Sequence, residues 1–120
     1  MFTICNEIQI DCAHYIPDHK KCGDIHGHTY TISIVIKGET LSPEGMLVDF
    51  GVLETIINEY DHRLLNECGW LDGVIPTAEN IAKVFWEEIQ EYCSSLPHLP
   101  QCSSVTVWET PTSFAVYTPE

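Results

Sequence analysis

Three histidines near the start of the chain have the types and spacing of a metal site. His14, His26 and His28 fall within fifteen positions, and the last two lie two residues apart, so in a strand they project from one face. Three neutral imidazoles are a catalytic ligand set for Zn²⁺ that leaves a fourth position open. A single histidine on an apolar face is more often a core residue, but three at one strand end predict Zn²⁺ binding. The histidines of polar or proline-rich segments, His19 and His98, are expected to be exposed.

Cys22 is a candidate for acid–base chemistry. It lies four residues before His26, in a polar loop, and directly follows Lys20 and Lys21. Thiols near ammonium groups or a dication ionise more readily than free cysteine, so a thiol at this place could serve as a general base. Taken by itself, a loop cysteine is usually incidental. The remaining cysteines are expected to be reduced and mostly buried, since no secretory signal accompanies them.

Two acidic positions could also take part in chemistry. Asp61 and His62 are expected to close the first helix, and a carboxylate beside a histidine supports proton transfer near neutral pH. Neighbours on a helix do not face each other, so the pair could act only if the helix ends there; the alternative is a histidine that favours the helix dipole. Glu109 closes an apolar strand pattern, where it would suit a ligand with two adjacent N–H donors or would be a solvated strand end.

Two strands must position the histidines. Residues 2–14 and 26–37 alternate between apolar and polar with a period of two, which is typical of strands with one buried face. If the two strands form an antiparallel hairpin, the three histidines meet at one end of one face. Two shorter strands are expected at residues 104–110 and 113–118, joined by a tight turn.

Two helices are expected between these strand pairs. Asp49 can cap a first helix whose apolar residues extend to Leu64, and Thr77 is the expected N-cap of a second. The order ββααββ predicts an α+β fold, with an antiparallel sheet and both helices packed on one face.

Composition narrows the class of protein. A chain of 120 residues fits one domain, residues 1–120, and a formal net charge of −13 argues against a nucleic-acid partner. No apolar run approaches the ~20 residues of a membrane span, and no signal peptide is visible, so we expect a cytoplasmic protein without a membrane partner. Lys20, Lys21 and Arg63 lie beside the motifs above, where they could hold an anionic small molecule or be solvated surface charges.

Together these motifs resemble the 6-pyruvoyltetrahydropterin synthase superfamily along nearly the whole chain. Six ordered signatures carry the resemblance: Ala13-His14, Cys22-Gly23-Asp24-Ile25-His26-Gly27-His28, Val48-Asp49-Phe50, Asp61-His62 with Leu64-Leu65-Asn66, Pro76-Thr77-Ala78-Glu79-Asn80, and Glu109-Thr110. The resemblance implies the roles of the individual residues: Zn²⁺ on His14, His26 and His28, catalysis by Cys22, Asp61 and His62, and pterin binding by Glu109 and Thr77. It also implies the tunnelling fold and a homo-oligomer, typically a hexamer of two trimers with active sites at subunit interfaces.

The spacing between Cys22 and the His-Gly-His motif is similar to that of one branch of the family, the 6-carboxytetrahydropterin synthases of the queuosine pathway. Three residues separate Cys22 from the His-Gly-His motif, whereas the pyruvoyl branch usually has a longer gap. A third branch, in folate synthesis, has glutamate where this chain has Gly23. The implied reaction converts 7,8-dihydroneopterin triphosphate to 6-carboxy-5,6,7,8-tetrahydropterin, acetaldehyde and triphosphate. The alternatives are triphosphate elimination, as in the pyruvoyl synthases, and a non-catalytic pterin- or zinc-binding module.

Overall fold

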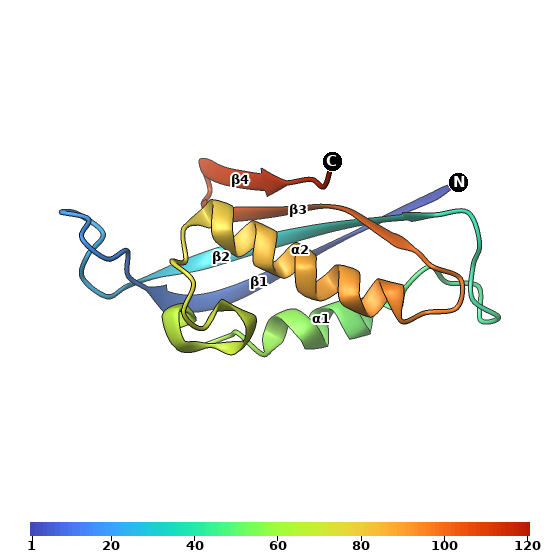
Figure 1. Cartoon of the computed structure of the whole chain (residues 1–120), viewed down its shortest axis with the longest axis horizontal. Helices are drawn as coiled ribbons and strands as arrows, with labels where there is room; N and C mark the ends of the chain where they lie inside the picture. Colours follow the sequence, from blue (N-terminus) through green and yellow to red (C-terminus); the bar gives the residue numbers. More distant parts are fainter.

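The computed structural model, which describes residues 1–120, is a four-stranded antiparallel sheet with two helices on one face (Figure 1). β1 (Phe2–His14) and β2 (His26–Gly38) pair along their whole length. β3 (Gln101–Thr110) lies next to β2, and β4 (Ser113–Tyr117) forms the other edge. The predicted α+β fold with the order ββααββ is confirmed.

The helices begin where their capping residues predict. α1 (Phe50–Asn58) follows Asp49, whose carboxylate accepts a hydrogen bond of 2.8 Å from a backbone N–H of the first turn. α2 (Ala78–Ser94) follows Thr77, whose hydroxyl oxygen accepts one of 3.2 Å in the same way. Each cap satisfies an N–H group that would otherwise lack a partner. None of the helices is both long and apolar enough to cross a bilayer.

The first helix is shorter than the sequence pattern predicts. Its apolar spacing continues to Leu64, but α1 ends at Asn58 and the chain turns. Two short 3₁₀ turns follow, at Leu65–Glu67 and Gly69–Leu71. The pattern continues because residues of this turning segment, such as Tyr60, are also buried beneath the sheet.

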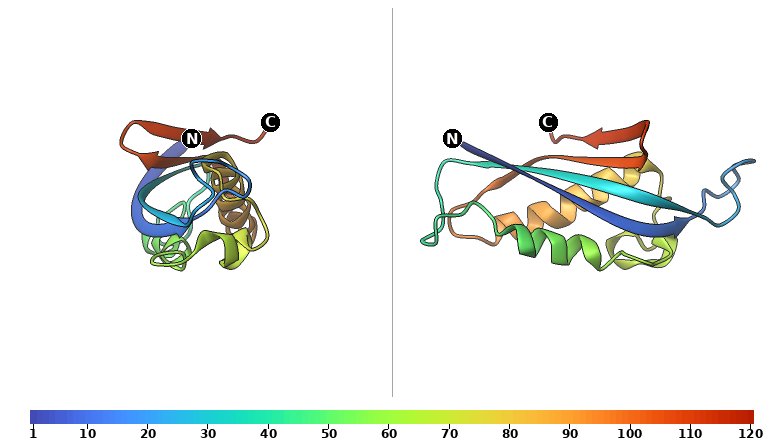
Figure 2. Two further views of the ribbon diagram at one scale, coloured as in Figure 1. Left: turned by 90° about the vertical axis from the view of Figure 1, so that its left-hand side faces the viewer. Right: turned by 180° about the vertical axis from the view of Figure 1, so that it is seen from behind.

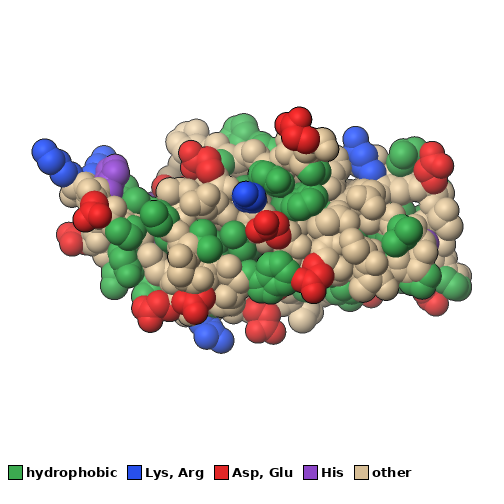
Figure 3. Space-filling model, in the orientation of Figure 1, with side chains coloured by type: hydrophobic (Ala, Val, Ile, Leu, Met, Phe, Trp, Pro, Cys, Tyr) green, Lys and Arg blue, Asp and Glu red, His purple; other side chains and the backbone are tan.

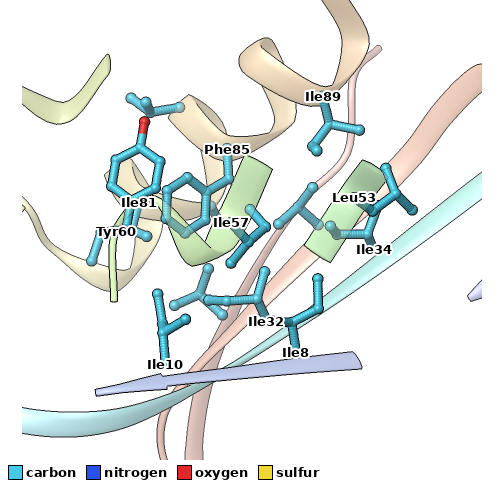
Figure 4. Close-up of a cluster of buried hydrophobic side chains, with 14 of the residues drawn as sticks. Ile8, Ile10, Ile32, Ile34, Leu53, Ile57, Tyr60, Ile81, Phe85 and Ile89 are labelled. Atoms are coloured by element: carbon cyan, nitrogen blue, oxygen red, sulfur yellow. The ribbon is translucent and has the colours of Figure 1, made fainter. Parts of the chain in front are cut away.

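The core fills the space between the sheet and the two helices, and Figure 4 shows part of it. The labelled side chains there come from β1, β2, both helices and the turn after α1: Ile8, Ile10, Ile32, Ile34, Leu53, Ile57, Tyr60, Ile81, Phe85 and Ile89. On β1 and β2 the buried residues share one parity, as the alternation predicts. The core therefore fixes which strand face carries His14, His26 and His28.

The outer face of the sheet has no helix against it. The sheet twists and curves around the two helices, which both lie on its inner side (Figure 2). β4 has one edge without a neighbouring strand, and so does β1 up to Asp11, from which point on its edge bonds the backbone of His62 and Arg63. Open strand edges present unpaired N–H and C=O groups, which proteins often cover by assembly.

Candidate metal centre and active site

The three predicted ligand histidines meet at one end of the sheet. His14 ends β1 and lies directly opposite His26, which begins β2, while His28 follows two residues along β2. The centroids of the three rings lie 4.6 Å (His14–His26), 5.1 Å (His14–His28) and 5.0 Å (His26–His28) apart. The antiparallel hairpin register thus produces the convergence that the sequence predicts.

Backbone carbonyls determine which nitrogen of two rings carries hydrogen. His14 Nδ1 lies 2.8 Å from the carbonyl oxygen of Pro76, and His26 Nδ1 lies 2.7 Å from that of Asp24. A carbonyl oxygen only accepts, so each Nδ1 must donate an N–H. Each neutral ring therefore has its lone pair on Nε2. Bonding of the second ring nitrogen to a carbonyl is the usual way in which metal-ligating histidines are oriented.

The donor atoms fit a metal ion that prefers imidazole ligands. The Nε2 atoms of His14 and His26 lie 3.0 Å apart, where two lone pairs repel unless a proton or a cation lies between them. His28 Nε2 is buried and has no hydrogen-bond partner. The candidate ligand atoms of the three residues all lie within 4.8 Å of one another. Burial lowers the pKa of His14, which favours the neutral form that binds metals.

A cavity of about 620 Å³ opens beside the histidines. It is lined by four predicted site residues, which are His14, Cys22, Thr77 and Glu109. These come from the end of β1, the loop before β2, the start of α2 and the end of β3. Exposed Phe114 of β4 adds an apolar wall. The volume and the mixture of apolar and polar walls suit a small organic molecule.

Glu109 lines this cavity and lies at an irregularity in the sheet. The register between β3 and β4 shifts between Trp108 and Thr110, which flank Glu109. Such bulges re-aim a side chain next to a site. Glu109 is half-buried, with Oε1 at 3.6 Å from His28 Nε2. The carboxylate therefore lies at the cavity wall beside the histidine cluster.

Asp61 and His62 do not close the first helix, and this expectation was wrong. They lie in the turn after α1, where His62 has a positive φ of 59°. His62 Nδ1 lies 3.0 Å from Asp61 Oδ2, so the pair can interact because the chain has left the helix. The backbone of Asp11 holds both residues: its N–H donates to Asp61 Oδ1 (2.8 Å) and its carbonyl accepts from His62 N–H (2.7 Å).

These contacts give the pair a defined protonation pattern. The hydrogen bond from the Asp11 amide is the main cause that lowers the pKa of Asp61, which stays ionised at neutral pH. The ionised carboxylate can accept only, so His62 Nδ1 donates to it. The Nε2 atom of His62 is then available for proton transfer.

Within one chain the pair does not share a cavity with Cys22. His62 lines a separate opening of about 570 Å³, together with Asp11, His28 and Thr29. Cys22 lines the cavity that contains His14 and Glu109. The structure therefore brings the three candidate ligand histidines, Cys22, Thr77 and Glu109 together and places Asp61–His62 apart from the thiol.

Three residues have contacts that the sequence analysis missed. His98 was expected to be exposed, but it is half-buried and its Nε2 donates to the Leu47 carbonyl oxygen at 2.7 Å. His19 is exposed, as expected, but its ring bonds the backbone next to Cys22. Asp11 orders the Asp61–His62 pair through its backbone, and no side-chain pattern announces such a contact.

Comparisons with known proteins agree on one family. The family model described as 6-pyruvoyl tetrahydropterin synthase matches residues 3–120. A Bacillus subtilis protein, 6-carboxy-5,6,7,8-tetrahydropterin synthase, is 38% identical over 126 residues, covering 99% of this chain and 86% of that protein. The 6-pyruvoyl tetrahydrobiopterin synthase of Dictyostelium discoideum is 31% identical over 104 residues, covering 81% and 73%.

The fold is also found among solved structures. The structure of Caenorhabditis elegans 6-pyruvoyl tetrahydropterin synthase superimposes with a TM-score of 0.78 at 24% identity. The match covers 99% of this chain and 96% of that one. At this identity the likeness shows a shared fold, which includes the sheet end that carries the histidines.

Proposed function

Because this chain belongs to the 6-pyruvoyl tetrahydropterin synthase family, we propose that it is a 6-carboxy-5,6,7,8-tetrahydropterin synthase of queuosine biosynthesis. It converts 7,8-dihydroneopterin triphosphate and one molecule of water to 6-carboxy-5,6,7,8-tetrahydropterin, acetaldehyde and triphosphate. The observation that carries the proposal is the single cavity that contains His14, Cys22, Thr77 and Glu109. The name of the Bacillus subtilis relative and the short gap between Cys22 and His26 support this product over the pyruvoyl one.

His14, His26 and His28 would hold Zn²⁺ in this enzyme. When bound there, the ion supplies a Lewis acid that polarises oxygens of the substrate side chain. The protein prepares the site in advance, since two carbonyl groups fix the rings with Nε2 toward the common centre. Calcium and magnesium prefer oxygen ligands, so an all-imidazole set favours zinc over them.

Glu109 and Thr77 would orient the pterin. A carboxylate has two oxygens and can accept from both the 2-amino group and the neighbouring ring N–H. Thr77 lines the same cavity; its oxygen already accepts from the Asn80 N–H, so its hydroxyl hydrogen remains free to donate. These contacts hold the side chain of the pterin toward Cys22.

Cys22 would act as the general base on the substrate side chain, with Asp61 and His62 moving protons beside it. Because this pair opens into a different cavity in one chain, we propose that a neighbouring copy supplies it. The free edges of β1 and β4 and the bare outer sheet face support such an assembly, a hexamer of two trimers.

The triphosphate needs positive charge, which is scarce in a chain with a net charge of −13. Lys20 and Lys21 are exposed in the loop that projects from the end of the sheet. Figure 3 shows basic side chains at the tip of this loop, while acidic groups are spread over the body. We propose that these two lysines attract the triphosphate tail.

Product analysis tests this proposal. The purified protein, given 7,8-dihydroneopterin triphosphate, is expected to yield 6-carboxytetrahydropterin and acetaldehyde in equal amounts. Mass spectrometry with an aldehyde trap measures both products. The Cys22→Ala variant, purified in the same way, is the control for contaminating activity. Triphosphate release with an intact three-carbon side chain would instead support the pyruvoyl reaction, which the name of the Dictyostelium relative favours. Binding without turnover would favour the non-catalytic module.

A further inference from the structure

We infer that His19 is a positioning residue that fixes Cys22 in the cavity by clipping the backbone of its loop. The kinetic part of this inference rests on the proposed function, whereas its structural part does not. We call this contact the clip: one ring nitrogen of His19 accepts hydrogen bonds from two backbone N–H groups.

The ring of His19 binds the two successive peptide groups on either side of Lys21. Its Nδ1 accepts from the N–H of Lys21 at 3.1 Å and from the N–H of Cys22 at 2.9 Å. An accepting Nδ1 needs its lone pair, so in the neutral ring the hydrogen is on Nε2. One side chain thereby holds two successive peptide groups that lead into the thiol-bearing residue.

The rest of the loop closes around the same point. The N–H of Ile16 donates to the carbonyl oxygen of Cys22 at 2.7 Å, and the N–H of His19 donates to the carbonyl of Ile16 at 3.3 Å. A Cβ atom at Gly23 would lie 2.5 Å from the carbonyl oxygen of His19, so the chain packs tightly there without a side chain. Cys22 is therefore bound by its carbonyl to one end of the loop and by its N–H to His19.

These internal bonds matter because the loop projects beyond the sheet (Figures 1 and 2). All hydrogen bonds of residues 16–22 lie within the loop itself. Its two ends are anchored outside it, at Tyr15 by Asn66 and at His26 by the sheet. Between these anchors, His19 is the only side chain that binds the backbone beside Cys22.

The clip lies at the cavity wall. His19 and Cys22 both line the cavity that contains Glu109 and His14. A general base must lie within hydrogen-bond reach of the proton it removes, and a misplacement of about 1 Å can cost about 10²-fold in rate. Loss of the clip should therefore lower kcat while the pterin contacts, and with them KM, are retained.

The geometry selects one rescuing substitution. Bonds from a side-chain acceptor to the N–H groups two and three residues later are those that asparagine makes in turns and caps. Asparagine Oδ1 is two bonds from Cβ, as histidine Nδ1 is, whereas glutamine Oε1 is one bond farther, as Nε2 is. His19→Asn preserves the acceptor at the position of Nδ1. His19→Gln is the matched control, because its amide oxygen lies one bond too far from Cβ. His19→Ala removes the acceptor.

The test compares these three variants with the wild type as full-length protein. Residue-resolved hydrogen exchange of the Lys21 and Cys22 amides reports the clip, and steady-state kinetics reports its consequence. In His19→Ala and His19→Gln the two amides are expected to exchange at least about tenfold faster. In the same two variants kcat should fall by about 10- to 100-fold with KM within about threefold. His19→Asn should restore both, and all variants should keep the wild-type metal content.

Three results would overturn the inference: unchanged amide exchange in His19→Ala, rescue by His19→Gln as complete as by His19→Asn, or failure of His19→Asn to restore either readout. Failure of the proposed function looks different. If the wild type forms no 6-carboxytetrahydropterin, the reaction is wrong, but the amide exchange of the variants still decides whether His19 holds the loop.

Discussion

His26→Ala is expected to abolish metal binding and turnover together while the fold survives. Loss of one of three imidazoles leaves two ligands, and the wild type should retain about one Zn²⁺ per chain where the variant retains almost none. A Lewis acid worth several kcal/mol of barrier corresponds to a loss of at least about 10³-fold in kcat/KM. Metal analysis of the purified proteins and a product assay measure the two effects.

The fold should survive because His26 is only half-buried at the end of the sheet, outside the hydrophobic core. His98→Ala is the matched control. His98 is also half-buried and bonds a carbonyl, but that carbonyl belongs to Leu47, which packs beside Gly38 at the far end of β2. We expect His98→Ala to lose about 1 kcal/mol of stability and to keep its metal. Full zinc occupancy in His26→Ala would refute the ligand assignment.

Sequence patterning predicted β1 and β2 well because the two faces of each strand differ so strongly. β1 has the predicted bounds, and β2 extends one residue beyond its predicted end at Lys37. One face of each must be buried beneath the helices, which gives an unambiguous period of two. The register follows from the same parity, and with it the meeting of His14 and His26. The convergence of the three histidines was therefore predictable from the patterns of the two strands.

The end of α1 was not predictable in this way. Tyr60 and Leu65 are both buried, although they lie outside any α-helix. Hydrophobic spacing records which residues face the core, and a turn that stays against the core preserves that spacing. After the helix has ended, the chain is held against β1 by hydrogen bonds between residues about fifty positions apart, such as that from the His62 N–H to the Asp11 carbonyl oxygen.

The orientation of the site depends on similar long-range contacts. The carbonyl that fixes His14 belongs to Pro76, 62 positions away, and the bulge at Glu109 depends on pairing with β4. The sequence around His14 and Glu109 contains no pattern that predicts either contact. His19 differs, since its contacts lie two and three residues along the chain. That pattern is familiar for asparagine and aspartate, and histidine at such a position is easily taken for a surface residue.

Cys22→Ala is expected to keep the fold and the metal but to lose most turnover. Cys22 is half-buried and lines the same cavity as Glu109, to which we assign the pterin anchor, and its side chain takes no part in the hydrogen bonds of its loop. Groups that act as general acids or bases contribute about 10²- to 10⁴-fold, so kcat should fall by that factor. Steady-state kinetics with metal analysis measures it. Cys5→Ala, which removes an exposed thiol on β1, is the control and should leave kcat unchanged.

A serine at the same position separates the chemistry of the thiol from its size. Cys22→Ser preserves the shape of the side chain and its capacity for a hydrogen bond. A hydroxyl ionises far less readily than a thiol, so at neutral pH serine is almost never in the deprotonated form that can accept a proton. If Cys22 removes a substrate proton, serine should be nearly as inactive as alanine. If Cys22 only fills the cavity wall, serine should restore activity, and alanine should cost less than about threefold. Because the metal content is expected to be equal in all three proteins, any difference in kcat between them belongs to the thiol.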